Sequence, residues 1–193
     1  MDIKEIRTLK ILEEIDSDFT PSQRDLAGEL NVSLGLVNSF IKRLVQKGYF
    51  KATTIPKNRI KYMLTPKGAA EKTRLTYQFV QHSLQFYKES RKKLRGLYKE
   101  LAAIGVKHII FYGVCDFAEI AYLSLLETNI QLTAVIDAVT EGKKFFNFII
   151  ENPSKLNSFK FDRILITDIQ NREKIVNDLI AKGIPREKIA VLE

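Results

Sequence analysis

The feature that most constrains the fold is a stretch from Pro66 to about Ala103 in which no further proline occurs and only two glycines weaken a helix. Every third or fourth residue forms one mostly apolar series: Thr73, Tyr77, Val80, Leu84, Tyr87, Arg91, Leu94, Tyr98 and Leu101. This alternating spacing is typical of a heptad seam. At 1.5 Å per residue such a helix is about 55 Å long, which exceeds what one small domain can bury.

Length and composition favour two small domains joined by this helix. The chain has 193 residues, of which 45% are apolar, so we expect domains over 1–70 and 104–193 with a connecting helix over 66–103. Cys115 is the one cysteine and no apolar run approaches the roughly 20 residues of a membrane span. These features, with an N-terminus that lacks an apolar signal core, predict a cytoplasmic protein without membrane partners.

Positive charge is concentrated in the first half of the chain. Residues 1–103 hold 20 Lys and Arg against 11 Asp and Glu, whereas residues 104–193 hold 11 against 12. No acid occurs in residues 30–70, although two arginines and six lysines do. Such asymmetry indicates a phosphate-rich partner for the first half, the alternative being a merely solvated basic surface.

Apolar spacing predicts three helices before residue 48, over about 3–16, 22–30 and 34–47. Asn31 tolerates the left-handed turn between the second and third, Ser33 is a cap candidate, and Gly48 ends the third. One apolar set would lock these two helices together as a helix-turn-helix: Leu26, Leu30, Val32, Val37, Phe40, Ile41 and Leu44.

The third helix then exposes polar and small residues where a recognition helix contacts base edges. The DNA-contact candidates on and before it are Ser33, Leu34, Gly35, Asn38, Ser39, Lys42 and Arg43. Asn38 can pair with adenine, Lys42 can reach guanine or phosphate, and Gly35 allows close approach. The alternative is a set of ordinary exposed helix residues.

Residues 49–64 predict two β-strands around Pro56-Lys57-Asn58-Arg59. A hairpin after a recognition helix is a wing, which would bring Lys57, Arg59 and Lys61 to the DNA backbone or minor groove. The run from Ser22 to Gly68, including LTPKG at 64–68, resembles the winged-helix domain of MarR-type transcriptional regulators. The resemblance implies double-stranded DNA as partner. Arg59 is the match for the wing arginine of that family, without the aspartate that commonly precedes it.

Winged-helix regulators read two-fold DNA sites as dimers. We therefore expect the seam over residues 73–101 to pair with its copy in a homodimer, the alternative being a helix that folds back on the two domains. The basic residues Arg91, Lys92, Lys93 and Arg95 are interpreted as a solvated face.

Beyond residue 104 the pattern changes to strand–helix alternation. Strands are predicted over 107–112, 131–136, 162–167 and 188–192, and helices over 116–126 and 172–182. This order predicts a mainly parallel sheet covered on both faces. Residues 143–153 read as a short strand or an irregular loop.

The loop after the first of these strands partly matches a dinucleotide-binding fingerprint. Gly113 and Ala118 fit its first and third positions, Cys115 replaces the middle glycine, and Asp137 stands where a ribose-binding acid is expected. Three stretches resemble the Rossmann-like N-terminal domains of sugar acyltransferases and nucleotide-sugar enzymes: AVID (134–137), DRILITD (162–168) and GIPREKI (183–189). The resemblance implies a nucleotide or nucleotide-sugar effector, and a ligand-free assembly domain stays an open alternative.

Catalysis and metal binding have little support in the sequence. The two histidines, His82 and His108, belong to unrelated elements, and no His/Cys/Asp cluster has zinc-site spacing. Cys115 is interpreted as a small buried residue rather than an oxidant sensor. We therefore expect a non-enzymatic, sequence-specific DNA-binding transcriptional regulator. The alternatives are a nucleotide-sugar or dinucleotide-dependent enzyme, and a DNA-binding adaptor whose C-terminal domain serves assembly.

Overall fold

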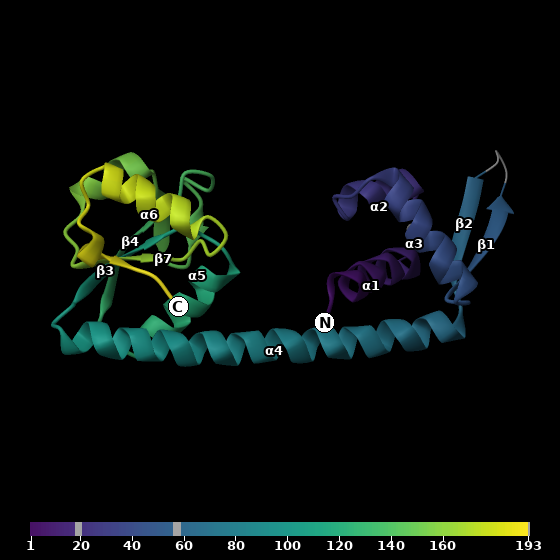
Figure 1. Cartoon of the computed structure of the whole chain (residues 1–193), viewed down its shortest axis with the longest axis horizontal. Coiled ribbons are helices and arrows are strands. Elements are labelled where there is room, and N and C mark those ends of the chain that lie inside the picture. The colour runs from purple at the N-terminus through teal and green to yellow at the C-terminus, as the bar shows by residue number, and fades with distance from the viewer. Residues whose placement is uncertain (18–20, 56–58, 193) are drawn as a thin grey trace. The chain divides into compact units, whose positions relative to one another are not determined.

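The computed structural model describes residues 1–17, 21–55 and 59–192. The chain divides into two compact units, Met1–Gln85 and Phe86–Glu193, and each is described by itself. Helix α4 (Pro66–Ala103) contributes residues to both units (Figure 1). The uninterrupted helix predicted over 66–103 is therefore confirmed.

The first unit begins with three capped helices, α1 (Ile3–Asp16), α2 (Gln23–Glu29) and α3 (Leu34–Gln46). Reciprocal side-chain and backbone hydrogen bonds cap α1 and α2, and the Ser33 hydroxyl accepts from the backbone N–H of Leu36 at the start of α3. Asn31 adopts a left-handed φ of 49° between α2 and α3. The predicted turn, cap and helix order are confirmed.

Strands β1 (Phe50–Ile55) and β2 (Arg59–Leu64) form the antiparallel wing, paired from Phe50 with Leu64 to Ile55 with Arg59. The Gln23 side chain donates a hydrogen bond of 2.7 Å to the Tyr62 hydroxyl, which ties α2 to the wing. The core of the unit gathers side chains from α1, α2, α3, the wing and α4: Leu9, Ile11, Leu12, Ile15, Leu26, Val37, Phe40, Ile41, Leu44, Phe50, Tyr62 and Leu75.

The end of α3, the wing and the start of α4 meet at Thr65. Its hydroxyl donates to the backbone oxygen of Gly48 at 2.6 Å and accepts from the backbone N–H of Gly68 at 3.0 Å. A Cβ atom at Gly68 would collide with the carbonyl oxygen of Tyr49 and with Leu64. Glycine is thus needed at residue 68 because backbone segments approach closely there.

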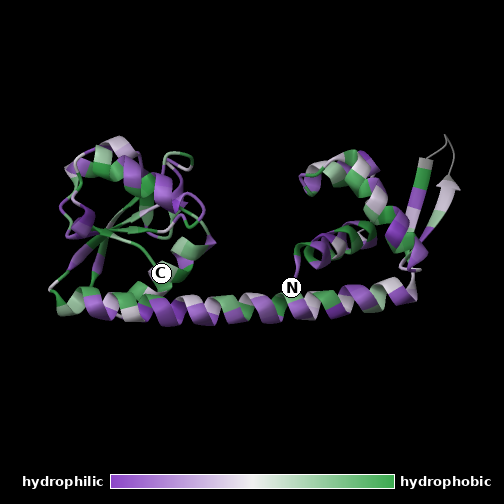
Figure 2. Cartoon of the chain, viewed as in Figure 1, coloured by the Kyte–Doolittle hydropathy of each residue, from purple (hydrophilic) through white to green (hydrophobic). Residues whose placement is uncertain are grey.

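The second unit is built on a six-stranded sheet in the order β5-β6-β4-β3-β7-β8. Its strands are β3 (His108–Tyr112), β4 (Gln131–Ile136), β5 (Lys144–Phe145), β6 (Phe148–Glu151), β7 (Arg163–Ile166) and β8 (Ile189–Ala190). All neighbours pair in parallel except β5 and β6. The predicted α/β unit is present with a mixed, mainly parallel sheet, whose strands are rich in hydrophobic residues (Figure 2).

Successive residues of the central strands point to opposite faces of the sheet, so two cores form. Ile109 and Phe111 pack with α5 (Asp116–Leu125) and the end of α4. Ile110 packs on the other face with the 3₁₀ turn η1 (Pro153–Ser158) and α6 (Arg172–Ala181). A second 3₁₀ turn, η2 (Arg186–Lys188), leads into β8. The expected cover on both faces is thus present.

The seam of α4 is not uniform, which corrects part of the dimer prediction. Leu94, Tyr98 and Leu101 are buried in the core of their own unit, and the Tyr98 hydroxyl donates to the carbonyl of Ala121 at 3.0 Å. This part of α4 therefore packs on its own unit, as in the alternative of a helix that folds back, and these three seam residues are not free to pair with a second copy. Farther toward the N-terminus, Tyr77, Val80 and Leu84 remain exposed.

Two further expectations are corrected in the second unit. Arg91 and Arg95 do not form a purely solvated face, because both bind the Glu127 carboxylate, Arg95 Nε at 2.8 Å. Residues 144–151 form a two-stranded hairpin rather than one strand or an irregular loop. Its turn places Phe146 at a φ of 50°, a conformation that apolar spacing does not reveal.

Candidate nucleic-acid interface

Helix α3 has one face buried in the core of the first unit and one face exposed to solvent. Val37, Phe40, Ile41 and Leu44 are buried in the core of the first unit. With 3.6 residues per turn, Gly35, Ser39, Lys42 and Gln46 then form the opposite face, and all four are exposed. Nothing lies within 4 Å of where a Cβ atom of Gly35 would stand, so a ligand can approach the backbone closely.

The remaining candidates of α3 lie around this outer face. Leu34 is 42% exposed in the first turn, and Ser33 is exposed while its hydroxyl caps the helix. Asn38 is half-buried on one flank. Sequence reasoning missed two exposed positions, Leu36 and Gln46, because it followed expected base contacts rather than the full helix circumference.

Arg43 is placed differently from Lys42. Its guanidinium carbon lies 4.6 Å from the centroid of the Phe40 ring. Arg43 also lines a hollow in which acids and bases are mixed: Asp2, Glu5 and Glu71 with Lys4, Lys47 and Arg74. Arg43 therefore lies on the flank of α3, in a hollow of mixed charge, whereas Lys42 is on the outer face.

The wing adds cations on one side. Lys51 pairs with Met63 and Thr53 pairs with Lys61 across β1 and β2, which puts both lysines on the strand face opposite the buried Tyr62. Both lysines are exposed. Lys57 lies outside the described residues. Arg59 begins β2, but its side chain also lies outside them.

Among the described residues, Lys42, Lys51 and Lys61 form no ion pair. Glu71, the first acid after the basic window, accepts two hydrogen bonds from Arg74, at 2.8 and 2.9 Å. These bonds hold the pKa of the Glu71 carboxyl below its usual range. Glu71, the first carboxylate that follows residues 30–70 in the sequence, is thus already paired with Arg74.

The partial dinucleotide fingerprint of the second unit has a structural explanation. Gly113 has a φ of 101°, and a Cβ atom there would stand 2.5 Å from Cβ of Asp168. Ala118 is fully buried in the core. Cys115 is exposed, contrary to expectation, and its thiol donates to the carbonyl of Thr167 at 3.2 Å.

The side chain of Asp137 is also engaged in hydrogen bonds within the protein. Its carboxylate accepts backbone hydrogen bonds from Val114, Val139 and Thr140, at 3.0, 2.7 and 2.9 Å. Burial alone raises the pKa of Asp137, but the bonds from these N–H groups outweigh it and lower the pKa below its ordinary value. Asp137 therefore fixes its own loop, with little capacity left for a ribose hydroxyl.

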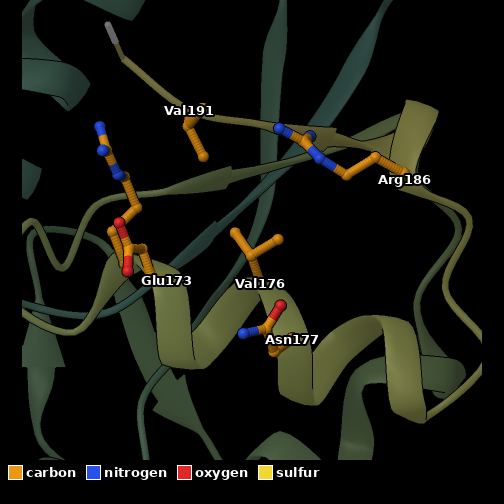
Figure 3. Close-up of a pocket in the computed structure, with 6 residues that line it drawn as sticks. Glu173, Val176, Asn177, Arg186 and Val191 are labelled. Atoms are coloured by element: carbon orange, nitrogen blue, oxygen red, sulfur yellow. The ribbon is translucent and has the colours of Figure 1, made fainter.

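A hollow of about 370 Å³ lies between α6 and the segment from η2 to Val191 (Figure 3). Val176 and Val191 point toward each other across it. Arg186 stands at its rim and donates to the carbonyl of Ile189 at 2.7 Å.

The two histidines do not come together, because His82 and His108 fall in different units. No metal-ligand group of three His, Cys, Asp or Glu residues occurs among the described residues. In the same residues, no helix combines the length and the apolar composition needed to cross a membrane.

Two family models match separate parts of the chain. Residues 4–51 match a family described as winged helix-turn-helix DNA-binding, and residues 105–190 match one described as C2185-like, N-terminal. No curated protein matches the chain.

Several solved structures show limited similarity. MepR, a transcription regulator of the Staphylococcus aureus multidrug efflux pump MepA, is 19% identical over 54% of this chain and 80% of its own, with a TM-score of 0.40. The zinc-dependent MarR family regulator AdcR is 22% identical over 54% and 74%, with a TM-score of 0.37. PcaV of Streptomyces coelicolor, solved with its natural ligand, is 14% identical over 66% and 72%, with a TM-score of 0.40. The chain thus joins a winged helix-turn-helix unit to an α/β unit that matches the C2185-like N-terminal family.

Proposed function

We propose that this protein is a sequence-specific DNA-binding transcriptional regulator of the MarR type. The observation that carries the proposal is the outer face of α3, which is exposed, capped by Ser33 and free of carboxylates. A helix with these properties fits the major groove of duplex DNA and meets its phosphates with complementary charge.

Each candidate has a distinct role in this proposal. Gly35 lets the helix backbone approach the groove, and Lys42 reaches guanine acceptors or a phosphate. Asn38, on the flank, pairs with adenine after a modest change of side-chain rotamer. Lys51 and Lys61 contact the sugar–phosphate backbone from the wing and set position rather than sequence preference.

The proposal includes a homodimer that forms through the exposed part of the α4 seam. Tyr77, Val80 and Leu84 follow heptad spacing and are 68%, 46% and 52% exposed. Leu75 precedes this stretch and Leu94 follows it, and each is buried within its own unit. Three exposed apolar residues on successive turns of one helix face are typical of a surface that a second helix covers.

The proposal assigns no catalytic activity to the second unit. Asp137 and Gly113, which a dinucleotide enzyme would use, have contacts inside the protein that account for them. A small-molecule effector of the second unit is compatible with the regulator and is taken up below.

The test is selection of duplexes from a random pool with the full chain, followed by anisotropy titrations at several salt concentrations. A regulator of this kind enriches one sequence, binds it at least about 10³-fold more tightly than random duplex, and loses affinity linearly in log salt. Equal affinity for selected and random duplexes would refute sequence-specific regulation.

A further inference from the structure

The second unit contains a cavity of about 230 Å³ that none of the fingerprint residues lines. Its walls come from five places: α4, the first turn of α5, the end of β7 with the residues that follow it, the start of α6, and the C-terminal segment. The lining residues are Phe86, Glu89, Ser90, Lys93, Phe117, Ile166, Ile169, Arg172 and Leu192.

This cavity lies at the topological switch point of the sheet. Strand β3 pairs with β4 on one side and β7 on the other, and the chain visits β4 before it crosses to β7. Phe117 follows β3, whereas Ile166 and Ile169 lie at and after the end of β7. In open α/β sheets ligands bind in this crevice, outside the carboxyl ends of the strands.

The lining indicates the class of ligand. Phe86, Phe117 and Ile166 offer apolar surface, and the charged side chains Glu89, Lys93 and Arg172 sum to one positive charge. Glu89 and Lys93 both have interactions within the protein. Arg172 donates through Nη1 to the carbonyl of Leu192 at 3.2 Å, which leaves most of its guanidinium donors for a carboxylate.

The volume limits the size of the ligand. An apolar cavity of about 150 Å³ holds a benzene ring, so about 230 Å³ admits one ring or a branched chain of similar size with a carboxylate. A nucleotide sugar is far larger than this space.

The contribution of α4 gives the cavity a regulatory consequence. Phe86, Glu89, Ser90 and Lys93 have the spacing i, i+3, i+4, i+7, so they form one face of α4 toward the cavity. The same continuous helix buries Leu75 in the core of the DNA-binding unit.

We propose that this cavity binds a small apolar monocarboxylate, and that its occupancy changes DNA affinity through the packing of α4. The binding site stands independently of DNA recognition, whereas its regulatory effect rests on the proposed function. The ligand contacts α4 and Arg172 at once, so it favours the arrangement of α4 that best closes the cavity. The reciprocal effect on DNA affinity is typically 5- to 150-fold.

The first experiment is calorimetric titration of the full chain with benzoate and with benzamide, its neutral counterpart of similar shape. Saturable binding of benzoate, at least tenfold tighter than benzamide, supports the site. Absence of benzoate binding, or equal binding of benzamide, overturns it whatever the DNA results.

Matched variants locate the ligand. Arg172→Gln removes the charge, and Ile169→Phe fills space at the cavity wall, so each should weaken benzoate binding at least tenfold. Arg186→Gln, in the hollow of Figure 3, and Ile180→Phe, on the exposed side of α6, serve as controls and should bind normally. Circular dichroism verifies that each variant folds. Arg172 also lines the hollow of Figure 3, so loss of binding in Arg186→Gln, with normal binding in Ile169→Phe, would place the ligand in that hollow and overturn the assignment.

The regulatory effect is measured with the selected duplex in the presence and absence of saturating benzoate. A change in affinity of at least fivefold for the wild-type chain, absent in Arg172→Gln, supports it. Unchanged affinity in a chain that binds both benzoate and duplex overturns the regulatory link alone. Failure to bind any duplex, with benzoate binding intact, instead contradicts the proposed function.

Discussion

The Asp137 carboxylate accepts a hydrogen bond from the backbone N–H of Val114 at 3.0 Å, and thereby ties the loop after β3 to the end of β4. The same carboxylate accepts two more hydrogen bonds, from the backbone N–H groups of Val139 and Thr140. A residue that sequence spacing assigns to a ribose thus serves to hold two loops together.

Replacement of Asp137 by asparagine should reduce stability, because the amide group cannot accept all three bonds. Hydrogen bonds to charged groups contribute about 1.5–3 kcal/mol each, so we expect a loss of roughly 2 kcal/mol at pH 7 in urea unfolding. Asp178→Asn, at an exposed position on α6, is the control and should unfold like the wild type. Equal stability of Asp137→Asn and the control would contradict the structural role.

The pH dependence of this difference follows from the lowered pKa of Asp137. A group with a depressed pKa in the folded state contributes stability above its unfolded pKa and loses it as pH falls through the folded one. The advantage of the wild type over Asp137→Asn should therefore be constant above about pH 5 and shrink below about pH 4. Unfolding curves collected from pH 3 to pH 7 provide the measurement, and a difference that grows on acidification would show the wrong sign.

Alanine at residue 113 should be poorly tolerated. The left-handed φ and the contact with Asp168 act together, and we expect a loss of about 2–4 kcal/mol in unfolding free energy. Gly105→Ala is the matched control, since residue 105 has a φ of 83° but nothing within 4 Å of the added carbon. It should lose only about 1 kcal/mol, and equal losses would argue against the contact with Asp168.

Lys42→Ala and Asn38→Ala should change which sequences bind. If these side chains contact base edges, each replacement costs about 1–3 kcal/mol on the selected duplex and much less on random duplex. Lys61→Ala should instead weaken both duplexes equally and reduce the salt slope by about one. Lys143→Ala, an exposed lysine of the second unit, is the control. If all three interface variants weakened the selected and the random duplex equally, the assignment of Lys42 and Asn38 to base contacts would be wrong.

Glutamate at residue 84 should dissociate the proposed homodimer. Leu84 is 52% exposed within one chain, so the change leaves the fold intact while it places like charges opposite each other in a paired helix. Sedimentation velocity should show a dimer for the wild type and a monomer for Leu84→Glu. Gln78→Glu, exposed and at a heptad position away from the seam, should remain dimeric. A monomeric wild type, or a dimeric Leu84→Glu, would refute pairing through this stretch.

The first unit could be predicted in detail because its signals are local. Asn31, Ser33 and Gly48 determine turns and helix ends through their own backbone preferences and side-chain oxygens. Their neighbours along the chain supply the partners, so no knowledge of distant segments was required.

Long-range contacts explain where sequence reasoning was insufficient. The need for glycine at residue 113 comes from Asp168, which is 55 positions away, and resembles a phosphate-loop requirement when only local sequence is seen. Heptad spacing likewise indicates an apolar face of α4 without naming what covers it. Leu94 and Tyr98 turned out to pack on their own sheet, whereas Leu75, outside the series, is buried in the first unit.

The position of Thr65 has a mechanical consequence for the first unit. Because its hydroxyl bridges Gly48 and Gly68, and because Gly68 has no room for a side chain, α4 cannot shift at its origin without carrying the wing base and the end of α3 along. A displacement of α4 at its origin would therefore reorient α3 and the wing together.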